Sequence, residues 1–400
     1  MIQVYSEIDK LEKVILHRPG RELLNLAPDM LEELLFDEIP YLEKAQEEHD
    51  KFKEIFEKNS VEVLYLEDLA AEAIETESIK DEFIKEFILE SKIYSPSIEK
   101  RVYDLLHEMD NKSLILKAME GIRKEEISVS EKSLLTDFCF DDPYFITKPM
   151  PNLYFTRDPF SLIGNGISLN HMWSEIRNRE TIFGKYIFKY HPNYKTDNFL
   201  YNRDILHSIE GGDQLIINSD TLAIGISQRT SARACEIFSE NVLKNTSFKQ
   251  VLAFVIPKKR AFMHLDTVFT MIDKDKFTVH PNIEGPLEVY KIFMEKDEIK
   301  VEKMEGTLEQ ILSKALNRDD IKLIRCGGGH PLDAAREQWS DGSNTLAIAP
   351  GEVIVYDRNT VTNELLEKNG VKIHVMVSGE LSRGRGGPRC MSMPYRRSIK

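Results

Sequence analysis

Cysteine is scarce in this sequence of 400 residues, which has four cysteines and none in a CxxC pair. Such spacing does not build a disulfide framework, so the sequence predicts a protein of a reducing compartment. Long apolar runs are also missing: no stretch approaches the roughly 18 apolar residues of a membrane-spanning helix, and the N-terminal residues lack the apolar centre of a signal peptide. We therefore expect a cytoplasmic protein without a membrane partner.

Positive charge is in deficit as well. The 53 Lys and Arg residues stand against 67 Asp and Glu residues, which gives a net charge of −14 and argues against nucleic acid as a partner. The glycine-rich stretch at 327–330 has neither a GK[ST] nor a GxGxxG continuation, so no nucleotide site is indicated. Cys326 and His330 lack a second pair of ligands, and the sequence therefore predicts neither a metal nor a cofactor.

The residues that are present are typical of a globular protein, with 42% hydrophobic and 30% charged. Residues 11–18 and 61–69 have the pattern of strands, and about 40–58 has the pattern of a helix between them. Residues 70–130 have apolar side chains at helical spacing and many charges. We expect three or four helices there, packed as an insertion on the main domain.

Short strands, glycine turns and single helices recur after about residue 150. The segments DTLAIG at 220–225 and NTLAIA at 344–349 are echoes between two such modules, and about five modules of related order are expected in all. Degenerate repeats of small sheets predict a radial, propeller-like α/β arrangement with a central site. We expect this catalytic domain to span 1–69 and 131–400, with a helical insertion domain at 70–130.

One stretch indicates a nucleophile. Cys390 lies in GRGGPRCMSMP, residues 384–394, where a glycine-rich loop can expose a thiol rather than bury it. His264 and Asp266 stand two apart in the apolar run MHLDTVF. In a strand both side chains would project from the same face, so this run predicts a buried ionisable pair.

Further acids lie beside turn residues. Asp158 precedes a proline at the end of an apolar run that we interpret as a strand, and Glu210 and Asp213 flank two glycines that let the backbone approach closely. Each of these acids is explained as readily by the chemistry of a turn as by catalysis. Taken alone, these acids therefore do not indicate a catalytic site.

Together the motifs resemble those of the arginine deiminases, in the guanidino-modifying (pentein) superfamily. The matching segments are, in order, NLYFTRDP, IEGGD, MHLDTVF and GRGGPRCMSMP, and LHRPG and LLFDEIPYL near the N-terminus are similar to the same family. The resemblance implies a pentein fold, a five-bladed α/β propeller of pseudo-fivefold ββαβ modules with a helical insertion. It also implies hydrolysis of L-arginine to L-citrulline and ammonia without metal or cofactor, by a homo-oligomer, dimer or tetramer.

The resemblance further implies roles for single residues. Cys390 matches the nucleophile that carries the amidino intermediate, and His264 matches the acid and base, with Glu210 beside it. Asp158 and Asp266 match the two carboxylates that hold the guanidinium. The remaining substrate contacts are implied for Asn152, Phe155, Arg177, Arg229 and Arg385.

These roles suit the chemistry of a guanidinium, whose delocalised charge makes its carbon a poor electrophile. Two carboxylates can localise that charge and present the carbon to a thiolate. Because a free thiol has a pKa of about 8.5, Cys390 needs a nearby cation, which could be the bound guanidinium, Arg385 or protonated His264.

The α-carboxylate of free arginine needs cations of its own, which Arg177 and Arg229 could supply. Agmatine lacks that carboxylate and would leave two buried cations unpaired. Arg179 lies two residues from Arg177, and the sequence leaves open which of them contacts substrate. Two alternative functions also remain: an amidinotransferase of the same superfamily and a non-catalytic arginine-binding protein.

Overall fold

The computed structural model describes residues 1–127, 134–138, 142–285 and 287–399. Five sheets in this part of the chain share one pairing pattern, in which a middle strand pairs antiparallel with one neighbour and parallel with the other. The sheets, in chain order of their middle strands, are β19 (Met393–Arg397), β1 (Leu11–Leu16) and β2 (Glu62–Tyr65); β5 (Phe160–Ile163), β6 (Gly166–Leu169) and β7 (Phe199–Tyr201); β8 (Gln214–Asn218), β9 (Thr221–Ile226) and β10 (Gln250–Val255); β11 (Phe269–Met271), β12 (Lys276–Val279) and β15 (Lys322–Arg325); and β16 (Leu346–Ala349), β17 (Glu352–Tyr356) and β18 (Lys372–Met376).

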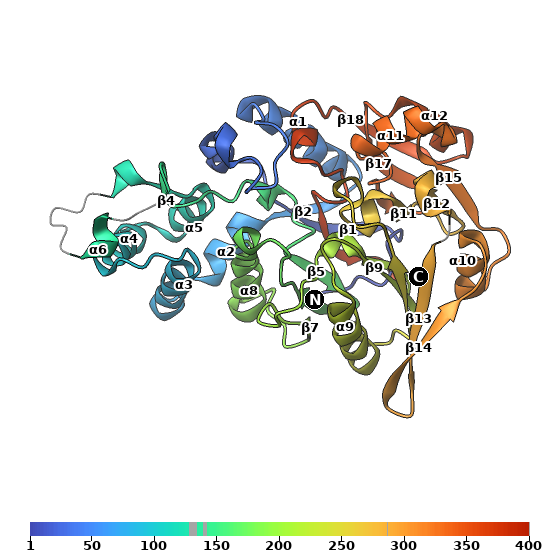
Figure 1. Ribbon diagram of the computed structural model, residues 1–400, viewed down its shortest axis with the longest axis horizontal. Coiled ribbons are helices and arrows are strands. Elements are labelled where there is room, and N and C mark those ends of the chain that lie inside the picture. Colours follow the sequence, from blue (N-terminus) through green and yellow to red (C-terminus); the bar gives the residue numbers. More distant parts are fainter. Residues whose placement is uncertain (128–133, 139–141, 286, 400) are drawn as a thin grey trace.

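A helix follows the middle strand of each sheet, because two parallel strands need a crossover connection. These crossover helices are α1 (Leu42–Lys58), α8 (Thr181–Tyr190), α9 (Ala232–Asn245), α10 (Leu308–Leu316) and α12 (Thr360–Lys368). The third sheet is extended by the hairpin of β13 (Glu288–Glu295) and β14 (Glu298–Met304), which projects from the molecule in Figure 1. Two short helices, α7 (Glu175–Asn178) and α11 (Pro331–Trp339), lie outside this pattern.

Five helices gather on the side of the molecule away from that hairpin (Figure 1). They are α2 (Leu66–Ala73), α3 (Glu77–Glu90), α4 (Pro96–Glu108), α5 (Asn111–Glu120) and α6 (Leu135–Phe138). A short pair of strands, β3 (Ile122–Arg123) and β4 (Phe145–Thr147), flanks α6 in the chain. Phe83 of α3 and Leu114 of α5 belong to the same buried apolar cluster as Phe183 of α8 and Met393 of β19. The helices therefore share a core with part of the sheets, and two further apolar clusters lie among the remaining strands and helices.

The expected N-terminal strand and helix are confirmed as β1 and α1, and most of 70–120 is helical as expected. The prediction of a strand over 61–69 is wrong beyond Tyr65, because helix α2 begins at Leu66. Its buried residues Leu66, Leu69, Ala70 and Ala73 recur at the spacing of a helix. Part of the expected 70–130 segment, 128–130, lies outside the described residues.

The two ends of the chain meet in one sheet. The C-terminal strand β19 pairs antiparallel with β1, which in turn pairs parallel with β2. This pairing holds Cys390, just before β19, among segments that are distant from it in the sequence. Among the described residues, no helix is both long and apolar enough to cross a bilayer.

Candidate active site

The loop that carries Cys390 is buried, which corrects the expectation of an exposed thiol. Cys390 is 4% exposed. A Cβ at Gly384 would lie 1.9 Å from the Tyr154 hydroxyl, and one at Gly386 would lie 2.3 Å from Phe155 Cε1. The glycines therefore serve to let the loop pack against two aromatic rings, and Phe155 lies under the loop as a buried side chain.

The Cys390 thiol lies between an acid and an amide. Its Sγ donates to Asp266 Oδ2 at 3.6 Å and accepts from Asn344 Nδ2 at 3.2 Å. Burial raises the pKa of Cys390 well above its usual value, and the carboxylates of Asp266, Asp158 and Asp341 add to this effect. The thiol is therefore protonated near neutral pH when no ligand is bound.

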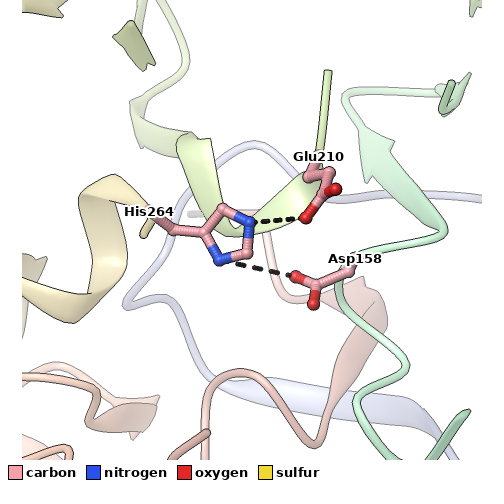
Figure 2. A group of neighbouring side chains, drawn as sticks. All are labelled: Asp158, Glu210 and His264. Carbon is pink, nitrogen blue, oxygen red and sulfur yellow. Dashed lines mark hydrogen bonds and ion pairs between the residues drawn. The ribbon is translucent and has the colours of Figure 1, made fainter. Parts of the chain in front are cut away.

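His264 lies between two carboxylates, as Figure 2 shows. Its Nε2 is 2.8 Å from Glu210 Oε2, and its Nδ1 is 3.9 Å from Asp158 Oδ1. Burial alone would lower the pKa of His264, but Asp158 and Glu210 outweigh it and raise this pKa to about 9. The imidazole is therefore a cation near neutral pH.

The strand expected around His264 and Asp266 is wrong. Residues Leu265–Thr267 form a 3-10 turn, because the buried Asp213 carboxylate accepts the Leu265 N–H at 2.8 Å and replaces a strand partner. The two side chains consequently meet different partners: His264 contacts Glu210, whereas Asp266 contacts the thiol. Both still belong to one site.

The other two acids lie beside turns, which is the structural alternative that the sequence left open for them. Asp158 precedes β5 instead of ending a strand, and Glu210 immediately precedes the 3-10 turn Gly211–Asp213. A Cβ at Gly212 would lie 2.5 Å from His264 Cγ, so a glycine is needed for the ring to approach. Burial would raise the pKa of Glu210, but Arg229, His264 and nearby Arg177 lower it to about 2.

Arg177 and Arg179 diverge from the short helix α7. Arg177 Nη1 lies 3.2 Å from Asp158 Oδ2 and 4.0 Å from Glu210 Oε2, and its Nη2 lies 2.9 Å from Glu180 Oε2. Arg179 instead donates to the Ser91 hydroxyl and to the Lys148 carbonyl. Of the two arginines, only Arg177 contacts the acids of the site.

The other predicted substrate contacts have partners of their own. Arg229 Nη1 lies 3.4 Å from Glu210 Oε2, and its guanidinium lies 5.0 Å from the centre of the Trp173 ring. Arg385 stacks on Trp339 at 3.5 Å, so it does not pair with the thiol as one of our hypotheses held. The Asn152 amide donates to the Leu34 carbonyl at 2.7 Å.

Three site residues were not singled out from the sequence as functional. Arg389 donates to Asp266 Oδ2 at 2.8 Å, and its charge offsets part of the rise in the pKa of Cys390. Asn344 contacts the thiol, and the buried carboxylate of Asp341 has its pKa raised by burial to about 7. The only sequence signal for Asp341 and Asn344 was the stretch DGSN at 341–344, which is typical of an ordinary turn.

Three buried carboxylate oxygens lack hydrogen-bond partners within the described part of the chain: Oδ1 of Asp158, Oδ1 of Asp266 and Oδ2 of Asp341. The first two form a pair beside His264 and the thiol. A buried acceptor without a donor is costly, and it is explained when a ligand brings the donors. The pair therefore indicates a planar cationic ligand with several N–H groups.

A metal ion is a poorer fit to these acids. Asp158, Glu210 and His264 offer ligand atoms within 4.8 Å of one another. However, His264 is protonated near neutral pH, and a protonated imidazole has no lone pair for a metal. Arg177 and Arg229 already compensate the charge of Glu210. The expected absence of a metal stays a prediction.

The family model of arginine deiminase matches residues 32–397. The chain belongs to the arginine deiminase family. It is 56% identical to the arginine deiminase of Treponema denticola over 405 residues, which covers 99% of this chain and 98% of that protein. The arginine deiminase of Clostridium perfringens is also 56% identical, over 403 residues that cover 98% of this chain and 97% of that protein. The resemblance inferred from the motifs is confirmed.

Solved structures relate this arginine deiminase family member to the α/β pentein fold. An amidinotransferase from Microseira wollei, SxtG, has a TM-score of 0.55 at 15% identity and covers 100% of this chain and 98% of its own. A dimethylarginine dimethylaminohydrolase has a TM-score of 0.53 at 13% identity and covers 96% of this chain and 99% of its own. At such identity the likeness concerns the fold alone.

Proposed function

We infer that the protein is an arginine deiminase, a hydrolase of C–N bonds in linear amidines that converts L-arginine to L-citrulline and ammonia. Membership of the family over nearly the whole chain supports this activity. The observation in the site that carries it is the pair of unpartnered buried oxygens, Asp158 Oδ1 and Asp266 Oδ1. A guanidinium would donate to both oxygens and so remove the cost of burying them.

The guanidinium would also activate the nucleophile. Asp158 and Asp266 raise the pKa of Cys390 in the free protein, after burial itself. A bound cation neutralises both carboxylates, so the pKa of the thiol falls as substrate binds. The thiol proton then leaves to solvent, and the thiolate faces the guanidinium carbon.

The proposed reaction proceeds through two tetrahedral adducts. The Cys390 sulfur forms a bond to the guanidinium carbon, and protonated His264 gives its proton to one amino group, which leaves as ammonia. An amidino group remains on sulfur. Neutral His264 then takes a proton from water, and the resulting hydroxide adds to the same carbon. As the C–S bond breaks, the hydroxyl proton of this adduct leaves to solvent, and citrulline and the thiolate are released. The released ammonia takes up a proton in water.

Arginine rather than agmatine is the proposed substrate, because the site has cations for an α-carboxylate. Arg177 and Arg229 pair with Glu210 Oε2 at 4.0 and 3.4 Å, so an α-carboxylate would share these two cations with Glu210. Arg229 Nε and Arg385 Nε have no hydrogen-bond partner within the described residues, so these groups can receive the carboxylate, whereas Arg385 Nη1 forms an ion pair with Asp37 at 3.6 Å. Asn152 and Phe155 would complete the contacts with the substrate.

We also propose an architecture and a setting for this enzyme. The five sheets with one pairing pattern are proposed as the blades of a five-bladed propeller over 1–69 and 131–400, with 70–130 as a helical insertion domain. The free, buried thiols of Cys235, Cys326 and Cys390 support a reducing, cytoplasmic setting. A homo-oligomer is proposed on the family resemblance alone, and light scattering of the purified protein tests it.

Purified protein incubated with L-arginine alone tests the activity. We expect citrulline and ammonia in equal amounts, and a mass spectrum quenched during turnover should show an amidino adduct on Cys390. Cys390→Ser should bind arginine without turnover, whereas Cys235→Ser, at another buried free cysteine, should keep wild-type activity. Product formation that requires an added amine would instead indicate an amidinotransferase, and binding without any product would indicate a non-catalytic protein.

A further inference from the structure

The turn at residues 341–344 lies against the thiol and is held rigidly. It follows α11 and leads into β16. Gly342 donates its N–H to the Glu337 carbonyl at 2.7 Å, and the Ser343 carbonyl accepts from the hydroxyls of Thr270 at 2.6 Å and Thr278 at 3.2 Å. The turn is therefore fixed to both the preceding helix and the neighbouring sheet.

Asn344 extends from this turn to Cys390 with its side-chain amide fully buried. Its Oδ1 accepts the Cys390 N–H at 3.1 Å, and its Nδ2 donates to Cys390 Sγ at 3.2 Å and to the Asp266 carbonyl at 3.2 Å. Since a backbone N–H must face an acceptor, the orientation of the amide is determined: the nitrogen faces the sulfur.

Asn344 also limits how the nucleophile loop can move. A Cβ at Gly387 would lie 2.6 Å from the Asn344 carbonyl oxygen and 2.8 Å from Asn344 Cβ, so the two segments are already in close contact. Within the described residues, Asn344 is the only side chain that donates a hydrogen bond to the Cys390 sulfur. The thiol thus has a fixed donor on one side and the Asp266 carboxylate on the other.

We propose that Asn344 is a catalytic residue whose amide hydrogen-bonds the Cys390 thiolate and holds the sulfur toward the carboxylates that receive the guanidinium. The proposal rests on Cys390 being the nucleophile of the proposed function. A neutral donor suits this position, because it stabilises the thiolate without competing with the guanidinium for Asp158 and Asp266. Asn344 transfers no proton in this role.

A purely structural role for Asn344 would be to hold the loop through the Cys390 N–H. Two variants and one control separate the two roles. Asn344→Asp keeps an acceptor for that N–H but places a negative charge at the sulfur, and Asn344→Ala removes both contacts. Asn359→Ala is the matched control, because the Asn359 amide is buried, donates to the Ser340 carbonyl at 2.9 Å and supports the same turn without touching the thiol.

The experiment measures the rate of alkylation of Cys390 by iodoacetamide against pH, without arginine, by mass spectrometry of the peptide that contains it. We expect the midpoint to rise by about one pH unit in Asn344→Ala, and further in Asn344→Asp, and to stay unchanged in Asn359→Ala. We also expect kcat to fall by about 10- to 100-fold in both Asn344 variants, with a smaller change in KM.

A wild-type alkylation profile in Asn344→Ala, or an equal shift in Asn359→Ala, would overturn the proposal. If Asn344→Ala does not fold, as judged by its circular dichroism spectrum, the nearly isosteric Asn344→Asp decides, and a wild-type midpoint in that variant rejects the proposal. Failure of the proposed function is distinguishable, because it would appear as wild-type protein that forms no citrulline, whatever its alkylation profile.

Discussion

The positions of single side chains in this site depend on their charged neighbours more than on residue type. Arg389 extends between two buried acids: it donates to Glu7 through Nε at 3.1 Å and through Nη2 at 3.0 Å, and to Asp266 through Nη1 at 2.8 Å. Arg389 therefore fixes the Asp266 carboxylate through Oδ2, whereas Oδ1 has no hydrogen-bond partner among the described residues. Arg389 is a positioning residue in this arrangement.

Arg389→Ala should strongly destabilise the protein, because it leaves Glu7 and Asp266 buried without their cation. We expect a loss of about 3–5 kcal/mol in the free energy of unfolding, measured by urea denaturation. Arg396→Ala is the control: Arg396 is half exposed and pairs with Glu12 at 2.8 Å, so its loss should cost less than about 1 kcal/mol. Equal losses in the two variants would contradict the role given to Arg389.

Activity should fall as pH rises through about 9, the pKa to which Asp158 and Glu210 raise His264 against burial. Above it the imidazole is neutral and cannot protonate the leaving ammonia. The ion pair of His264 with Glu210 also stabilises the folded state. This stabilisation is fully present below the ordinary histidine pKa of about 6.5 and is lost as pH rises through about 9, the pKa of His264 in the folded protein.

Glu210→Gln should move that descending limb of kcat/KM to lower pH, since the imidazolium loses its partner at 2.8 Å. Glu236→Gln, which changes an acid on the exposed face of α9 paired with Arg233, is the control and should leave the limb in place. If the descending limb of kcat/KM stays at the same pH in Glu210→Gln, His264 is not the acid that titrates there.

At the scale of elements, short turns rather than strands carry the site. Glu210 and His264 immediately precede 3-10 turns, Asp158 precedes β5, and Cys390 lies between a 3-10 turn and β19. Turns can aim side chains in directions that a regular strand does not allow, provided their backbone groups are satisfied elsewhere. In this site buried side chains accept hydrogen bonds from the backbone of the turns, as the Asp213 carboxylate does from the Leu265 N–H.

Gly386→Ala should lower activity because the added Cβ would meet Phe155 Cε1 at 2.3 Å and displace the nucleophile loop. We expect kcat to fall by at least about tenfold, since misplacing a reacting atom by about 1 Å has a large effect on rate. Gly285→Ala is the control, because among the described residues other than its chain neighbours no heavy atom lies within 4 Å of the added Cβ. Wild-type turnover in Gly386→Ala would show that the loop tolerates the shift.

At the scale of the whole molecule, a buried histidine joins the first sheet to the helical region. His17, directly after β1, places Nδ1 2.7 Å from Glu67 of α2 and Nε2 3.2 Å from Glu22. Burial alone would lower the pKa of His17, but Glu67 and Glu22 outweigh it and raise this pKa to about 10. The contact therefore depends on a positive charge.

His17→Asn should lower the free energy of unfolding by about 3–5 kcal/mol near neutral pH, because two buried acids lose their cation. The stabilisation in the wild type is fully present below a pH of about 6.5 and is lost as pH rises through about 10, so the difference between the proteins should narrow there. Urea denaturation across that pH range measures it. His107→Asn, at an exposed ion pair with Glu77, should show little difference at any pH.

The sequence by itself determined the family and the α/β class with a helical region, because these depend on local motifs and on hydrophobic spacing. It also put Cys390, His264, Asp266, Asp158 and Glu210 forward as candidates. Only the tertiary structure decided that Cys390 is buried, that Arg177 rather than Arg179 contacts these acids, and that Asn344 and Arg389 surround the reacting groups. Burial and pairing between residues distant in the sequence arise from packing, which no local pattern encodes.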